Sequence, residues 1–355
     1  MQDKIRVGIV GASPDRGWAV RAHVPALRTS PAFELVAVST SRPESARRAA
    51  QAFGVQHSFA DVQELVALDE IDLVVITVKV ATHAELTHAA IKAGKHVYCE
   101  WPLALSSEEA IELEQAAQQV GVRTAIGLQA RYSPAFAYAR ELIKTGYVGR
   151  VTSATLYSSR SKGATEAVPE WTAYTYDRVS AAGLVEVLGG HSLDLVQHLL
   201  GPIEEATART SIQHPRHSVA ETGEPIKVTA PDHLDLIGKV SDGATVSVHL
   251  HDGEIGAPRT RLEISGTAGS LTVESVPDEN PWAEQLQITH LSVRGTDCEL
   301  PIPDHFRSTP PGLTTEAANV ARLYQRLAVD LETGSREVPD FTTGRRLHEL
   351  LRTAD

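Results

Sequence analysis

The sequence is poor in cysteine, in long apolar runs and in positive charge. Its 355 residues include only Cys99 and Cys298, too few and too far apart for a disulfide framework. No stretch approaches the roughly 20 apolar residues of a membrane span, and we find no signal peptide. The formal net charge of −12 argues against a nucleic-acid surface, because phosphate binding requires clustered Lys and Arg. We therefore expect a cytoplasmic protein that binds neither membranes nor nucleic acid.

The remaining composition is that of an ordinary globular protein with two domains. Hydrophobic residues make up 42% and charged residues 22% of the chain, and its length suits two cores. Up to residue 128, strand-like segments at 5–10, 33–39, 71–78, 96–99 and 124–128 alternate with helical ones. This alternation predicts a parallel sheet with helices on both faces.

After residue 150 the pattern changes. Segments 151–158, 233–240, 245–251 and 261–264 have the period of two that is typical of half-buried strands, which predicts a mainly antiparallel sheet. Residues 213–232 are expected to form a long loop, and residues 317–333 and 343–353 to form helices.

A glycine-rich turn follows the first strand. Gly11 stands at the first position of a dinucleotide-binding turn, Ser13 stands at the second, and Gly17, followed by Trp18, comes one residue late. Such a turn lets backbone N–H groups approach a pyrophosphate, although an ordinary strand–turn–helix connection is the alternative. We predict an α/β protein with an N-terminal Rossmann dinucleotide-binding domain over residues 1–128. A C-terminal α/β domain with an open, mostly antiparallel sheet follows over residues 129–355, and its last helices can pack back on the first domain.

The end of the second strand bears on the choice of cofactor. An NAD site usually places Asp or Glu there to bind the ribose hydroxyls, whereas this chain has Ser39, Thr40 and Arg42. Small hydroxyls do not repel a 2′-phosphate, and a guanidinium binds it through paired hydrogen bonds. The alternative is a solvated arginine that opens the next helix. We predict NADP in preference to NAD, with NAD still possible.

The run Val97-Tyr98-Cys99-Glu100-Trp101-Pro102 resembles the Glu-Lys-Pro motif of the Gfo/Idh/MocA family of nicotinamide-dependent sugar oxidoreductases. Trp101 stands where that family has its catalytic lysine. The resemblance implies that Val78, His83 and Glu100 lie beside the cofactor. Lys79 replaces a family proline and is either an exposed loop lysine or a cation within reach of the cofactor.

A second motif bears on proton transfer. Gly190-His191-Ser192-Leu193-Asp194 resembles the family segment whose histidine takes or gives the substrate proton. The family carboxylate four residues earlier is replaced by Val187, and Glu186, one position off, would point elsewhere on an α-helix. His191 remains a candidate acid or base, and a core histidine bonded to backbone is the alternative.

The chain is similar to one branch of the family in particular. Residues 17–27, Glu100-Trp101 and residues 230–234 resemble a fungal repressor of the galactose regulon, a non-catalytic member that also has tryptophan in place of the lysine.

Three functions remain open. The first is an NADP(H)-dependent oxidoreductase acting on a carbohydrate-like hydroxyl, with His191 handling the proton, Trp101 shaping the pocket, and Lys79 or Lys162 replacing the lost ammonium. The second is a catalytically silent NADP-binding sensor that signals to a partner, and the third is redox-assisted lyase or glycosidase chemistry. We expect a homodimer or homotetramer and no metal site.

Overall fold

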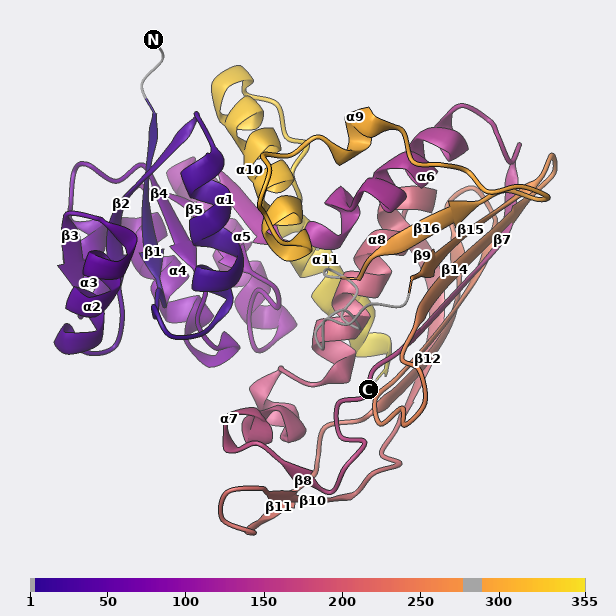
Figure 1. The fold of residues 1–355 in the computed structure, drawn as a ribbon, viewed down its shortest axis with the longest axis horizontal. Coiled ribbons are helices and arrows are strands. Elements are labelled where there is room, and N and C mark those ends of the chain that lie inside the picture. The colour runs from indigo at the N-terminus through magenta and orange to yellow at the C-terminus, as the bar shows by residue number, and fades with distance from the viewer. Residues whose placement is uncertain (1–3, 277–288, 355) are drawn as a thin grey trace. The chain divides into compact units, whose positions relative to one another are not determined.

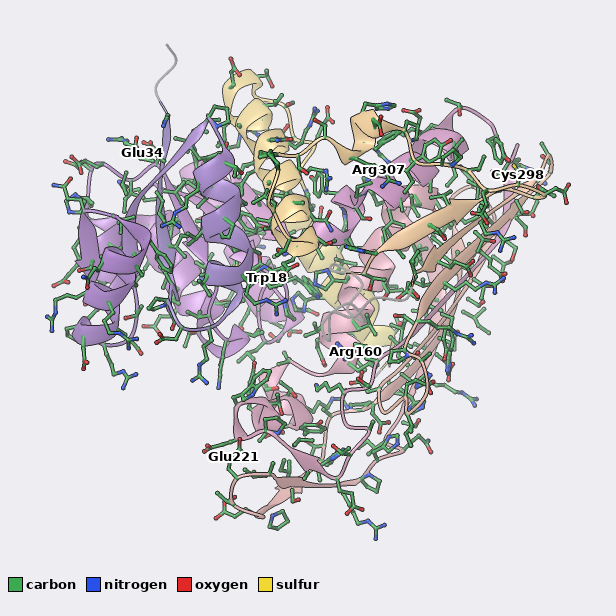
Figure 2. The ribbon with its side chains drawn as sticks, viewed as in Figure 1. Trp18, Glu34, Arg160, Glu221, Cys298 and Arg307 are labelled. Atoms are coloured by element: carbon green, nitrogen blue, oxygen red, sulfur yellow. The ribbon has the colours of Figure 1, made fainter. Side chains whose placement is uncertain are left out.

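The computed structural model describes residues 4–276 and 289–354. The chain divides into two compact units, Met1–Gln129 with Thr309–Arg346 and Ala130–Ser308 with Leu347–Asp355. Across the described ranges, no helix has the length and apolar character needed to cross a membrane. Cys99 is buried and Cys298 is exposed, and both are free thiols. Figure 2 labels Cys298.

The first unit is built on a six-stranded sheet (Figure 1). Its strands are all parallel and lie in the order β3-β2-β1-β4-β5-β6. Their bounds are β1 (Ile5–Val10), β2 (Phe33–Ser39), β3 (His57–Phe59), β4 (Leu73–Ile76), β5 (His96–Glu100) and β6 (Thr124–Gly127). This is the strand order of the Rossmann fold. Strands β2 and β3 are added on one side of β1 and strands β4 to β6 on the other, so the strand order reverses between β1 and β4. The predicted domain type is therefore confirmed.

Helices connect these strands: α1 (Val24–Thr29), α2 (Pro43–Phe53), α3 (Val62–Val66), α4 (His83–Lys92) and α5 (Ser107–Val120). The start and end of α5 follow from its capping residues. Ser106 accepts a hydrogen bond from the Glu109 amide, and Gly121 ends the helix in the left-handed conformation at φ 81°.

Helix α10 (Thr315–Thr333), predicted at residues 317–333, also belongs to the first unit. Its Tyr324 is fully buried, with ring centroids 5.1 Å from Phe33 and 5.4 Å from Tyr98. A helix from the end of the chain thus completes the core beside β2 and β5.

The second unit contains a seven-stranded sheet in the order β16-β15-β14-β7-β13-β12-β9 (Figure 1). Every pairing is antiparallel except that of β7 with β13, as predicted for an open, mostly antiparallel sheet. The bounds are β7 (Val151–Ser159), β9 (Ile203–Ser211), β12 (His233–Val240), β13 (Thr245–His251), β14 (Thr260–Gly266), β15 (Ser270–Ser275) and β16 (Leu291–Arg294). Alternate residues of β12 and β13 are buried, which fixes their register.

The expectation of a long loop over residues 213–232 was wrong. That segment contains β10 (Arg216–Val219) and β11 (Pro225–Lys227), which form a three-stranded sheet with β8 (Ala167–Val168). These strands are two to four residues long, which is too short for the alternation that identifies longer strands.

The other helices are α6 (Pro134–Lys144), α7 (Glu170–Ala173), α8 (Gly190–Leu200), α9 (Asp304–Arg307) and α11 (Phe341–Leu351). Of these, α8 carries His191, and a π-helical turn, Val185–Gly189, runs directly into it.

Candidate functional site

The turn after β1 requires glycine at its first position. Gly11 has φ 91°, and a Cβ atom there would lie 2.7 Å from Cγ1 of Val78 and 3.0 Å from the Thr77 carbonyl oxygen. The amide of Gly11 donates to the Ser39 carbonyl at 2.8 Å, which ties the turn to the end of β2. Any side chain at position 11 would therefore both strain the backbone and displace the end of β4.

A cavity of about 420 Å³ opens where β1, β2 and β4 end. Six predicted cofactor residues line it together: Gly11, Ser13, Ser39, Thr40, Arg42 and Val78. In a doubly wound sheet, ligands bind outside the carboxyl ends of the strands at the point where the strand order reverses. The cavity lies at that point.

The cavity carries basic rather than acidic groups near the end of β2. Arg42 and Arg16 both line it, and neither guanidinium makes a hydrogen bond or ion pair with another described residue. The Thr40 hydroxyl contacts the Ser45 hydroxyl at 2.5 Å, and Glu85 on α4 is a lining carboxylate. Arg16 had no predicted role. Its place in the glycine-rich turn was the only sequence signal.

Gly17 and Trp18 lie further along the turn and do not line this cavity. Gly17 has φ 105° with open space around it. Trp18, labelled in Figure 2, directly precedes the π-helical segment η1 (Ala19–His23). The Trp18 indole nitrogen is buried without a hydrogen-bond partner among the described residues. Their predicted cofactor role stays a prediction.

His83 joins two strand ends. Its Nδ1 lies 2.8 Å from the Pro102 carbonyl oxygen and its Nε2 3.1 Å from the Val78 carbonyl oxygen. Burial lowers the pKa of His83, so the ring is neutral near pH 7. Both ring nitrogens face main-chain oxygens, and His83 orders the segments that follow β4 and β5. Lys79, just before it, is exposed.

Glu100 is held by a network within the first unit. Its two carboxylate oxygens lie 2.9 Å from Nε2 of His23 and 3.0 Å from Nε2 of Gln129. Nδ1 of His23 contacts the Tyr324 hydroxyl at 2.8 Å, so α10 supports the chain of contacts. His23 and Tyr324 had no predicted role, because only the tertiary structure brings them to Glu100.

Trp101 follows Glu100 and is 6% exposed, and its peptide bond to Pro102 is cis. Trp101 directly follows β5, at the position where the family motif has a lysine. A neutral ring at this position supplies apolar surface and one N–H donor, and no charge.

His191 is 4% exposed on α8. The preceding turn is π-helical, so its hydrogen bonds join residues five apart instead of four. The assumption of α-helical spacing was therefore wrong, and the argument that Glu186 points away from His191 no longer applies. Farther along α8, Asp194 forms a buried ion pair with Arg131, and the carboxylate accepts from Nε of Arg131 at 2.9 Å.

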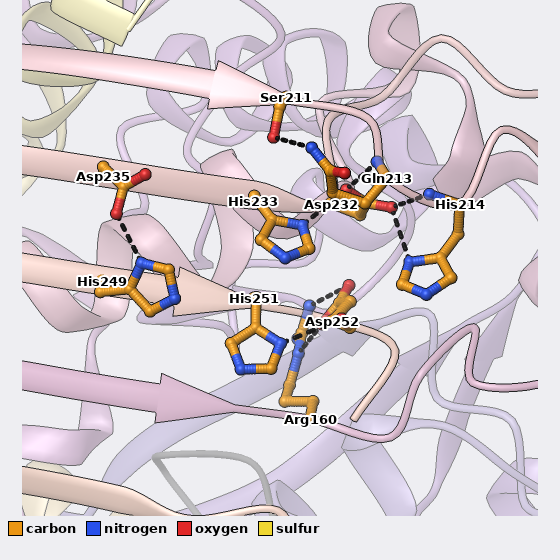
Figure 3. A network of polar contacts seen from close by, with 10 residues as sticks. All are labelled: Arg160, Ser211, Gln213, His214, Asp232, His233, Asp235, His249, His251 and Asp252. Atoms are coloured by element: carbon orange, nitrogen blue, oxygen red, sulfur yellow. Dashed lines mark hydrogen bonds and ion pairs between the residues drawn. The ribbon is translucent and has the colours of Figure 1, made fainter. Parts of the chain in front are cut away.

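Histidines gather on one end of the large sheet (Figure 3). Asp232 accepts from His214 and His233, and Asp235 contacts His249 at 2.5 Å. Among the residues that the structure describes, no three His, Cys, Asp or Glu side chains are arranged to hold a metal ion.

A Rossmann unit with a cavity at its switch point defines a dinucleotide-binding protein. Residues 5–128 match the model described as the oxidoreductase family with NAD-binding Rossmann fold, and residues 134–275 match the C-terminal domain of Gal80p. The dehydrogenase aclE of Aspergillus oryzae is 33% identical over 77% of this chain and 78% of its own length. The chain belongs to the Gfo/Idh/MocA oxidoreductase family.

Relatives of both functional kinds are similar to this chain. The galactose/lactose metabolism regulatory protein GAL80 of Saccharomyces cerevisiae is 28% identical over 76% of this chain and 66% of its own length. A structure of levoglucosan dehydrogenase with NADH and levoglucosan has a TM-score of 0.82 at 22% identity, covering 99% of this chain and 96% of that one. The chain is therefore similar in sequence to a regulator and shares its fold with a sugar dehydrogenase.

Proposed function

We propose that the protein is an NADP(H)-dependent oxidoreductase acting on a hydroxyl or carbonyl group of a sugar- or polyol-like compound. The observation that carries the proposal is the cavity at the strand ends of the first unit, with Arg16 and Arg42 in its lining and no carboxylate at the end of β2. An arginine pair suits a 2′-phosphate, and an aspartate would repel it.

The residues present fit a dinucleotide. Glycine at position 11 keeps the turn packed against the end of β4, because a Cβ there would lie 2.7 Å from Cγ1 of Val78. Gly11, Ser13 and Arg16 of this turn line the cavity and would hold the pyrophosphate. When bound, the nicotinamide ring would accept or donate the hydride.

The chain's own residues supply the other parts. His191 takes the hydroxyl proton during oxidation and returns it during reduction, because an imidazole titrates near neutral pH. Trp101 forms an apolar wall against a sugar ring and keeps water out. The ring of His83 holds the ends of two strands in place.

The alternative is a silent NADP-binding sensor. It is supported by Trp101 and Val187 at two family catalytic positions and by the 28% identity to GAL80. Both functions include cofactor binding, so only turnover separates them.

The test is a screen of the purified protein with NADP(H) and with NAD(H). The panel contains levoglucosan, D-glucose and D-sorbitol as neutral compounds and D-glucose 6-phosphate as a charged one, followed by absorbance of the reduced nicotinamide. We expect turnover of a neutral compound with NADP(H). Tight cofactor binding without turnover of any member would favour the sensor.

The role of His191 is tested by His191→Asn. We expect turnover to fall by about 100-fold or more, with cofactor affinity unchanged, since general acid–base catalysis contributes on that order. His305→Asn removes an exposed imidazole of the same unit and serves as the control. Retained activity in the His191 variant would make His191 structural.

A further inference from the structure

Lys162 is held in place by the segment that follows β7. Arg160 forms a buried two-point ion pair with Asp252, at 2.7 and 2.9 Å (Figure 3). The carbonyl oxygen of Lys162 accepts from the Gly253 amide at 2.8 Å. Backbone and ion pair together fix the position from which the lysine side chain extends.

Among the described residues, the Lys162 ammonium has an aromatic neighbour but no hydrogen-bonding partner. Its Nζ lies 5.1 Å from the centre of the Tyr176 ring, a cation–π distance. It makes no hydrogen bond or ion pair with another described residue. Burial lowers the pKa of Lys162 to about 8, while Asp252 and Glu186 favour its charged form and Arg160 opposes it. A half-buried ammonium for which the described residues provide no acceptor favours binding of one from outside the protein.

His217 on β10 stands on the other side of Tyr176, with ring centroids 4.5 Å apart. It is 7% exposed, and its Nδ1 is buried without a hydrogen-bond partner among the described residues. Buried polar atoms are nearly always satisfied in native proteins, by water or ligand where protein groups are missing.

Lys162, Tyr176 and His217 line one cavity of about 20 Å³. Roughly 10–15 Å³ of such volume holds one water, so the cavity admits a single oxygen atom. A hydroxyl accepts from the ammonium and, in either tautomer of His217, pairs with Nδ1.

The charged groups around the cavity do not select an anionic ligand. The carboxylates Asp232 and Asp252 line it beside Lys162 and His217. Asp252 is balanced by Arg160, whereas Asp232 faces His214 and His233. The two carboxylates together offset the charges of Arg160 and Lys162, so the surroundings carry no net positive charge that would favour an anion over a neutral hydroxyl.

We propose that this cavity binds one hydroxyl of a neutral sugar or polyol, with Lys162 and His217 as its hydrogen-bonding partners. The inference rests on the proposed function for its ligand class, and it makes Lys162 a residue that recognises uncharged substrates.

The test compares wild type, Lys162→Met and Lys239→Met. Lys239 is an exposed lysine on β12 and does not line the cavity, so it is the matched control. Saturation-transfer NMR and steady-state kinetics measure the Kd and KM for levoglucosan, D-glucose, D-sorbitol and D-glucose 6-phosphate. We expect Lys162→Met to raise Kd and KM for the neutral compound at least 10-fold, with NADPH affinity and melting temperature unchanged. Lys162→Arg, which keeps the charge, should recover part of the affinity.

The outcomes separate the two proposals. Binding of a neutral compound that depends on Lys162, without any turnover, supports this cavity and contradicts the oxidoreductase. Equal affinity of wild type and Lys162→Met for the neutral compound overturns the inference. So does a failure of wild type to bind any neutral compound, or a preference for D-glucose 6-phosphate.

Discussion

Arg42 is the residue on which the proposed preference for NADP(H) most depends. We expect Arg42→Ala to reduce the difference in binding free energy between NADPH and NADH by about 1–3 kcal/mol, the scale of a hydrogen bond to a charged group. Calorimetric titration with both cofactors measures this difference. Arg47→Ala, exposed on α2 and outside the cavity lining, is the control. Equal affinity of the wild type for the two cofactors would rule out the preference.

Variants of Trp101 distinguish two hypotheses, a working substrate pocket and a disabled ancestral site. If the indole is part of a working pocket, Trp101→Lys should weaken ligand binding and lower activity, because it removes stacking surface and places a charge at a site that is 6% exposed. Trp101→Phe keeps an aromatic ring and should retain more of both. Turnover and ligand affinity of the two variants are the measurements. A gain of activity in the lysine variant, with no loss of ligand binding, would mean that Trp101 only disables the site.

At the scale of elements, the π-helical turn before α8 changes which carboxylate can serve His191. A turn with hydrogen bonds five residues apart brings a residue at i−5 into the place that i−4 has on an α-helix. Glu186 stands at that spacing. We expect Glu186→Gln to lower turnover and to change the acid limb of the pH profile of kcat, while Val187→Asp gives no gain. An unchanged profile would show that Glu186 does not act through His191.

Glu186 also has a consequence for stability. Burial raises its pKa above the ordinary 4.5, so the folded state holds the proton more tightly than the unfolded state does. The contribution of Glu186 to the free energy of unfolding is fully present below pH 4.5. It is lost as the pH rises through the raised pKa of the folded state. Relative to Glu186→Gln, the wild type should therefore become less stable across that window and stay so at pH 7. Urea unfolding of both proteins between pH 4 and 8 measures this trend, and parallel curves would contradict it.

The elements that the sequence predicted well share a strong local pattern. Strands β1, β2, β12 and β13 begin and end where their apolar residues predict, and α5 follows its capping residues. Edge strand β9 was missed because it buries little of its surface, and so it has no clear alternation. The π-helical turn was missed because its hydrogen-bond register depends on tertiary packing.

At the scale of the whole molecule, the candidate site contains residues predicted from motifs and residues that only the tertiary structure brings to them. The glycine-rich turn and the end of β2 could be predicted because the local sequence determines their structure. His23 contacts both Glu100 and Tyr324, and His23 and Tyr324 are 301 positions apart in the sequence. No local sequence pattern reveals such a contact. The cavity at Lys162 likewise depends on the pairing of β10 with β8. The homodimer or homotetramer stays a prediction.

The central claim is that hydride transfer occurs in spite of the tryptophan at position 101. The most direct measurement uses NADPH deuterated at its transferable C4 position, with the oxidised forms of the neutral panel compounds as acceptors. Our account predicts deuterium on the reduced carbon of a sugar or polyol product, detected by NMR, and much less of it with His191→Asn. Tight binding of NADPH with no deuterium in any product would contradict the oxidoreductase and leave a protein that binds its cofactor without using it.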